Sequence, residues 1–255
     1  TEINAGSLLG GIAVILTTRC VSGTFAPPAR LLLISDVTAN PMGAGAAATK
    51  TIANEGAPDR LIDVSSTLSE ARFHNADRGL PIPAGRSSLA VDAAHIMIAP
   101  ADAPFENGAL LPLTLRFEQA GNVSVKARFM VPEPGSMAAH MAMGHGTMQH
   151  EVTDAAPPEV RLTVVEDDRG WIAQIDTRNF TFSEELQVGD HVPGLGHAHV
   201  YLGDMKLGRL FSNSYAIGAL PPGQHLLRVT LNTNDHRAYA IDGQPIVAET
   251  IIEVD

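Results

Sequence analysis

The chain has 255 residues, 45% of them hydrophobic, which is enough for two ordinary domains with their own cores. The net charge of −11, with lysines and arginines scattered along the sequence, argues against a nucleic-acid-binding surface, which needs basic patches. The single cysteine, Cys20, excludes a disulfide within the chain and any cysteine-based zinc or thioredoxin motif.

The N-terminal region, residues 1–28, fits two interpretations. Residues 8–18 (LLGGIAVILTT) form an apolar run with the length of a signal-peptide core, followed by small residues that suit a cleavage site. The run is too short for a membrane span. The same residues also suit a buried N-terminal strand. The sequence therefore leaves a cleaved leader and an N-terminal strand as alternatives.

Residues 29–130 contain short apolar runs separated by turn signals such as NEG, IPAG and AGN. No stretch has the sustained 3.6-residue period of a helix. This pattern predicts one antiparallel β-sandwich or barrel. The expected strands are 31–38, 46–54, 61–65, 71–74, 87–91, 95–98, 111–117 and 122–129.

The composition changes sharply at residues 131–158, which begin and end with prolines and lack a core-building pattern. We interpret this segment as a linker. Its dense methionines and histidines are hard to explain by packing, and neutral thioether and imidazole donors suit copper. The alternative is a solvated linker without metal. The candidate ligands are Met137, His140, Met141, Met143, His145, Met148 and His150.

Residues 159–255 are again rich in strands and turns, and predict a second small β-sandwich. Asp242-Gly243 is a tight-turn signal, and the run LPPG at 220–223 is another. The whole chain is therefore expected to be all-β. The expected strands are 160–166, 171–176, 198–202, 206–210, 226–231 and 245–254.

A candidate metal site in the first domain comprises His74, His95 and Met97. His95 and Met97 are two residues apart on an expected strand, so their side chains point to one face. Imidazole with thioether is a soft, uncharged donor set that suits Cu(I). The alternative is a core methionine beside a surface histidine.

Residues 29–129 resemble the PCu(A)C family of periplasmic copper chaperones. The resemblance implies a cupredoxin-like β-barrel that binds Cu(I) through histidine and methionine and delivers copper to cytochrome oxidase. It rests on several stretches in family order: KTIANEG at 50–56, DRLIDVSS at 59–66, ARFH at 71–74, IPAG at 82–85, HIM at 95–97, FENGALLPLTL at 105–115 and AGNVSV at 120–125.

One departure from the family pattern concerns the ligands. The first histidine of the family matches His74, and the closing histidine-x-methionine pair matches His95 and Met97. The loop that carries a middle methionine in the family is shortened here to residues 75–80, so three of four family ligands remain. Met42 is a candidate substitute.

The second domain carries the sequence Gly-His197-Ala-His199, whose two histidines share one face of an expected strand. His236, in a polar stretch after a strand, is the favoured third ligand, with His191 and His225 as alternatives. Met205 and Tyr215 are weaker candidates. An imidazole-only set suits Cu(II) or zinc. The alternative is that these histidines only form hydrogen bonds.

We therefore expect a periplasmic copper-binding protein that accepts Cu(I) and delivers it to a partner, such as a cytochrome oxidase subunit or its assembly factor. Storage or sequestration of copper, a copper-dependent oxidase centred on the second domain, and an adhesion module are the alternatives. No Gly-x-Ser-x-Gly or His-Glu-x-x-His motif occurs, so we do not expect an enzyme.

Overall fold

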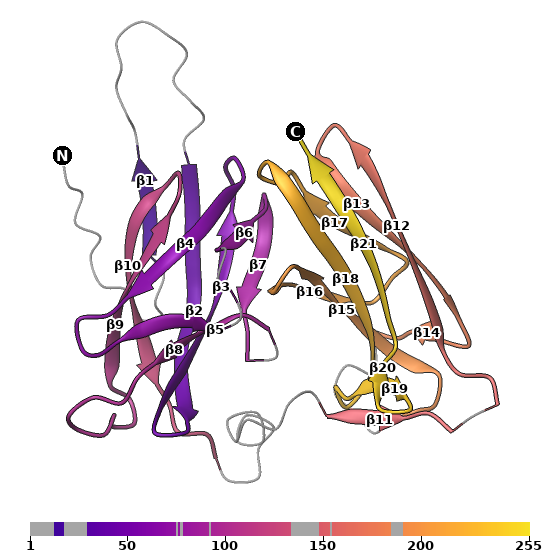
Figure 1. Cartoon of the computed structure of the whole chain (residues 1–255), viewed down its shortest axis with the longest axis horizontal. Helices are drawn as coiled ribbons and strands as arrows, with labels where there is room; N and C mark the ends of the chain where they lie inside the picture. The colour runs from indigo at the N-terminus through magenta and orange to yellow at the C-terminus, as the bar shows by residue number, and fades with distance from the viewer. Residues whose placement is uncertain are drawn as a thin grey trace, which may run out of the picture. The chain divides into compact units, whose positions relative to one another are not determined.

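The computed structural model describes residues 13–17, 30–74, 76, 79–91, 93–133, 148–153, 155–184 and 191–255. Within these ranges the chain is all-β, which confirms the predicted fold class (Figure 1). The described residues include no helix of a length and apolarity that would cross a membrane. The chain divides into two compact units, Thr1–His145 and Gly146–Asp255.

In the described residues of the first unit, ten strands are present, and eight of them pair in one continuous run, β5–β8–β3–β2–β10–β9–β4–β6. All of these pairings are antiparallel except the short parallel contact between β10 and β2, and β1 and β7 add to β2 and β3. The strands are β1 (Ala13–Thr17), β2 (Arg30–Met42), β3 (Gly45–Asn54), β4 (Asp59–Ser65), β5 (Ala71–His74), β6 (Leu80–Ile82), β7 (Gly85–Leu89), β8 (His95–Ile98), β9 (Leu110–Phe117) and β10 (Gly121–Phe129).

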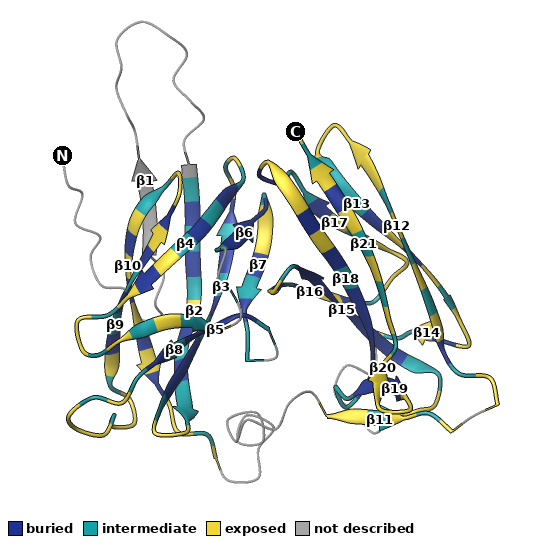
Figure 2. Cartoon of the chain, in the orientation of Figure 1, coloured by how far each residue is buried: buried dark blue, intermediate teal, exposed yellow. Residues whose placement is uncertain are grey.

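The core of the first unit follows the two-residue period of its strands. Along β10, every second residue from Val123 to Phe129 is buried and the residues between them are exposed (Figure 2). In β8, Ile96 and Ile98 are buried. His95 and Met97 therefore lie on the opposite, outer face of this strand.

The second unit contains two sheets. The smaller sheet has the order β12–β13–β17. In the larger sheet, β15 pairs with β16 and β18, and β18 pairs with β21 and β19. The strands are β11 (Gln149–Glu151), β12 (Glu159–Asp167), β13 (Gly170–Arg178), β14 (Thr181–Phe182), β15 (Leu195–Leu202), β16 (Met205–Leu210), β17 (Ser214–Gly218), β18 (Gly223–Thr233), β19 (Ala238–Ile241), β20 (Gln244–Pro245) and β21 (Val247–Val254).

Strand β15 is buried on both of its faces. Ala198, Val200 and Leu202 are fully buried on one face. His197, His199 and Tyr201 alternate with them on the other face and are at most 4% exposed. Two imidazoles are thus held in a low-dielectric environment on a central strand, where their cost of burial must be offset by partners.

The structure differs from the sequence-based expectation at several short strands. Residues 149–151 of the expected linker form β11, which runs parallel to β19. Strands β6, β14, β17 and β19 were not expected from the sequence. At the N-terminus, Ala13–Thr17 pairs antiparallel with β2.

Candidate metal sites

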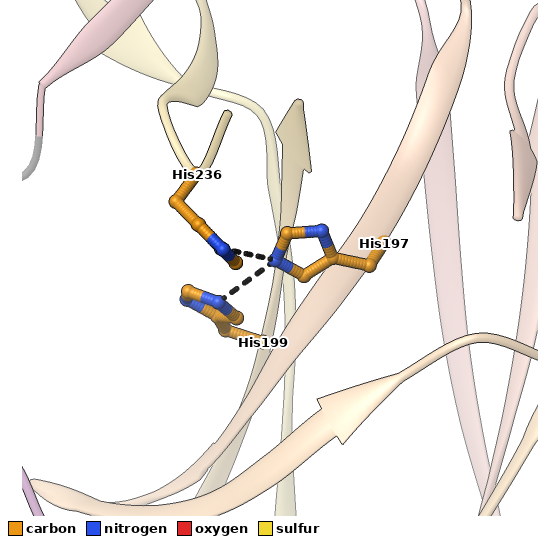
Figure 3. Close-up of side chains that lie close together, drawn as sticks. All are labelled: His197, His199 and His236. Carbon is orange, nitrogen blue, oxygen red and sulfur yellow. Dashed lines mark hydrogen bonds between the residues drawn. The ribbon is translucent and has the colours of Figure 1, made fainter. Parts of the chain in front are cut away.

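Three imidazoles converge in the second unit (Figure 3). His197 and His199 come from β15, and His236 comes from the turn between β18 and β19. The Nε2 atom of His197 lies 3.1 Å from Nε2 of His199 and 3.2 Å from Nδ1 of His236. One ligand atom from each residue falls within 4.8 Å of the others. The structure therefore brings together the three histidines that the sequence favoured.

A polar turn holds His236 in place. His236 has φ +67°, a left-handed conformation that histidine adopts more readily than most residues, and its N–H donates to the Thr233 carbonyl at 3.0 Å. Arg237 Nε donates to both carboxylate oxygens of Asp235, at 3.1 and 2.9 Å. Burial alone would raise the pKa of Asp235, but hydrogen bonds from Arg237 and Thr233 lower it. The ionised carboxylate thus accepts the hydrogen bonds that hold the turn.

The electrostatic environment keeps the imidazoles neutral. Burial is the main cause that lowers the pKa of His197 to about 3, with smaller contributions from His236, Arg209 and Lys206. Burial, followed by the charge of Lys206, lowers the pKa of His199 well below its ordinary value. Because only a neutral imidazole can donate a lone pair to a metal, both residues are ready to bind one at neutral pH.

The Nδ1 side of the His199 ring has polar neighbours of its own. Its Nδ1 atom lies 3.2 Å from the Tyr201 hydroxyl and 3.3 Å from Lys206 Nζ. If Nε2 binds a metal, Nδ1 carries the proton and must donate it. The tyrosine oxygen can accept that hydrogen bond, whereas an ammonium group cannot. Tyr201 therefore suits the role of orienting His199 for metal binding.

We expect Tyr201→Phe to weaken metal binding at the three-histidine cluster by about ten-fold, because loss of an outer hydrogen-bond partner typically costs ten-fold to a hundred-fold in affinity. Isothermal titration with Zn(II) would measure this change. Tyr215→Phe, on the other sheet, is the matched control and should bind as the parent does. Equal affinity in the parent and the Tyr201 variant would contradict the orienting role.

In the first unit, His74 and His95 are paired directly across β5 and β8. Their rings stack at 4.6 Å between centroids, with 29° between planes. Met97 is two residues from His95, and therefore on the same face, diagonally across from His74. The three predicted ligands thus lie on one outer face, with His95 buried, Met97 half-buried and His74 exposed.

The tautomer of His95 follows from its backbone contact. Its Nδ1 atom lies 3.0 Å from the Ala93 carbonyl, which can only accept a hydrogen bond. Nδ1 therefore carries the proton of the neutral ring, and a metal would be bound through Nε2. Together with the exposed His74, this geometry gives a donor set close to the surface.

Met42 lies on the same sheet face as these ligands. It is paired with Gly45 across β2 and β3, and Ala47 is paired with Met97 across β3 and β8. Because Gly45 and Ala47 are two residues apart, the register places Met42 and Met97 on one face. This placement is compatible with Met42 as a substitute for the missing methionine.

The other candidates have separate positions. His225 Nε2 donates to the Pro221 carbonyl at 2.7 Å, and Met205 is fully buried. The His191 ring contacts the His150 ring at a tilt. None of these three belongs to the three-histidine cluster. Met137, His140, Met141, Met143 and His145 lie outside the described residues.

One residue that the sequence reasoning missed, Tyr201, extends the alternation of His197 and His199 by one further step. Its two-residue spacing was therefore a usable signal. Lys206 and Arg209 gave no comparable signal, because their approach to the cluster depends on the register of β15 and β16.

Comparisons with known proteins bear on the first unit. Residues 32–129 match the family model described as "Putative lipoprotein LpqE-like". Among curated proteins, none is matched to this chain.

Three solved structures are similar over part of the chain. The copper-bound PCuAC domain from PmoF2 is 27% identical, over 40% of this chain and 93% of that domain, with a TM-score of 0.35. The apo PCuAC domain from PmoF1 is 25% identical, over 40% and 94%, with a TM-score of 0.37. The apo PmoF2 PCuAC domain is 22% identical, over 48% and 96%, with a TM-score of 0.36.

The family match covers the same residues as the motifs quoted above, which confirms the resemblance inferred from sequence. Residues 32–129 are thus similar to the LpqE-like family.

Proposed function

We propose that this protein binds copper outside the cytoplasm and passes it to a partner protein. The observation that carries the proposal is the cluster of His74, His95 and Met97 on one outer face of the first unit. Neutral imidazole and thioether donors select Cu(I) yet release it more readily than thiolates do. Because His74 is exposed, the ligands of an acceptor protein can approach copper bound at this cluster.

The first unit supports the transfer function more than the second does. In the first unit, His74 is exposed and Met97 is half-buried. In the second unit, His197 and His199 are 1% and 4% exposed. Exchange between proteins needs accessible ligands, so we assign transfer to the first site and longer retention of metal to the second.

The buried three-histidine cluster favours one alternative function, a copper centre that stores metal or supports redox chemistry. Three neutral imidazoles fit Cu(II) or zinc as well as Cu(I). We favour binding over catalysis. The oxidase would be favoured instead by a copper-dependent turnover that disappears in His197→Ala but persists when the ligands of the first unit are replaced by alanine.

The location and the partner follow from the same chemistry. A family of lipoproteins matches residues 32–129, which supports an extracytoplasmic, periplasmic location. In such an oxidising compartment, methionine and histidine are more durable copper donors than thiolates. The acceptor we propose is a copper site of cytochrome oxidase or of one of its assembly factors.

The test is transfer of bound Cu(I) from the full chain to an apo cytochrome oxidase copper domain. The parent should transfer faster than chelator-buffered copper at the same free concentration. A variant with alanine at His74, His95 and Met97 should fall to the buffered rate, while His197→Ala should transfer as the parent does. A parent no faster than buffered copper would sink the chaperone proposal and leave sequestration as the better account.

A further inference from the structure

A second pair of imidazoles lies in the second unit, apart from the three-histidine cluster. His150 is on β11, directly opposite Tyr239 of β19. His191 packs on it, with 4.0 Å between ring centroids and 48° between planes. Tyr239 contacts both rings edge-on, at 5.4 and 5.7 Å. Residues 41 positions apart in the sequence are thus brought into direct ring contact.

Both histidines line a pocket of about 430 Å³ within the second unit. Its other walls include Glu151, Asn179 and Tyr239. Neither histidine is fully buried, since each is of intermediate exposure. An ion or a ligand on a donor protein can therefore reach both rings, in contrast to the enclosed His197 and His199.

A thioether, that of Met148, leaves the chain on the same side as the His150 ring. Met148 is two residues before His150, so the two side chains leave the extended backbone on the same side. The Met148 carbonyl accepts a hydrogen bond from the Ala238 N–H at 2.8 Å, which ties this backbone to β19. The Met148 side chain is 46% exposed. The local donor set is one thioether and two imidazoles.

We infer that Met148, His150 and His191 form a Cu(I) site on the second unit. Neutral soft donors select Cu(I) over harder divalent ions, and Cu(I) is satisfied by two or three of them. Three further methionines and two further histidines precede this site in the sequence, within residues 137–145. The inference rests on the proposed copper function and adds a receiving site at the end of the Met/His-rich stretch.

The experiment is a Cu(I) titration of the full chain against a chromophoric Cu(I) chelator. His150→Gln and His191→Gln should each lower the stoichiometry by about one Cu(I) equivalent, and the double variant should lose no more than either single one. Met148→Leu should weaken this site by about ten-fold. Met130→Leu, an equally exposed methionine in the first unit, is its matched control and should change nothing.

Two further measurements distinguish loss of this site from unfolding of the second unit. Zn(II) binding at the three-histidine cluster should persist in His150→Gln and His191→Gln, which shows that the second unit is still folded. In the parent, Ag(I) as a spectroscopic substitute for Cu(I) should shift the ring NMR signals of His150 and His191 together. An unchanged Cu(I) stoichiometry in both variants, or a shift of neither ring, would overturn the site, whatever the result of the transfer experiment.

Discussion

Replacing His197 with alanine should abolish the metal-dependent stabilisation of the second unit. Its Nε2 atom lies within 3.2 Å of the facing nitrogens of both His199 and His236, so it is the central donor of the cluster. Metal that binds only the folded state stabilises it by about 4 kcal/mol at a free concentration of a thousand times Kd. We expect Zn(II) to raise the unfolding midpoint of the parent by several degrees and that of the variant hardly at all.

Unfolding of the second unit can be followed separately, because the only tryptophan, Trp171, is in β13. His74→Ala is the matched control, since that residue is in the first unit and should leave the zinc-induced shift at Trp171 intact. The alanine at position 197 also removes a buried polar ring, so the midpoint without metal can change in either direction. The decisive quantity is the difference with and without zinc, and an undiminished difference would eliminate the cluster as a metal site.

Two of the three histidines of the cluster could be predicted because they are close together in the sequence. The spacing of His197 and His199 puts both rings on one face of any strand that contains them, whatever the rest of the fold. His236 was favoured because polar turns after strands often present ligands. Whether His236, His191 or His225 reaches His197 and His199 in the folded chain depends on how the strands pair. No local pattern in the sequence reveals that register.

The first unit shows the same limit. Strands 71–74 and 95–98 were predicted with the observed bounds, because short apolar runs between turn signals mark them clearly. That His74 lies opposite His95 could come only from the family resemblance, since 21 residues separate them. The exposure of these two histidines could not be predicted from the sequence either. His95 is buried and His74 is exposed, although both are histidines on expected strands.

Acid should destabilise the metal-free second unit between pH 6.5 and 5. His197 has its pKa lowered by burial, and then by neighbouring positive charges, from 6.5 to about 3 in the folded chain. Burial lowers the pKa of His199 as well. In the unfolded chain both histidines take up protons below pH 6.5, whereas in the folded chain they stay neutral. Because the unfolded state then binds more protons, stability is fully present above pH 6.5 and falls as the pH drops toward 3.

A proton bound only in the unfolded state lowers stability by up to about 1.4 kcal/mol per pH unit, so His197 alone should lower the free energy of unfolding by at most about 2 kcal/mol between pH 6.5 and 5. His199 changes it in the same direction. Urea unfolding of the metal-free chain, followed at Trp171, measures this slope. His197→Gln should flatten the slope, since it removes one titrating group, and His74→Gln in the first unit should not. A parent with equal stability at pH 6.5 and 5 would show that the cluster accepts protons in the folded state, and hence that acid could displace its metal without unfolding the unit.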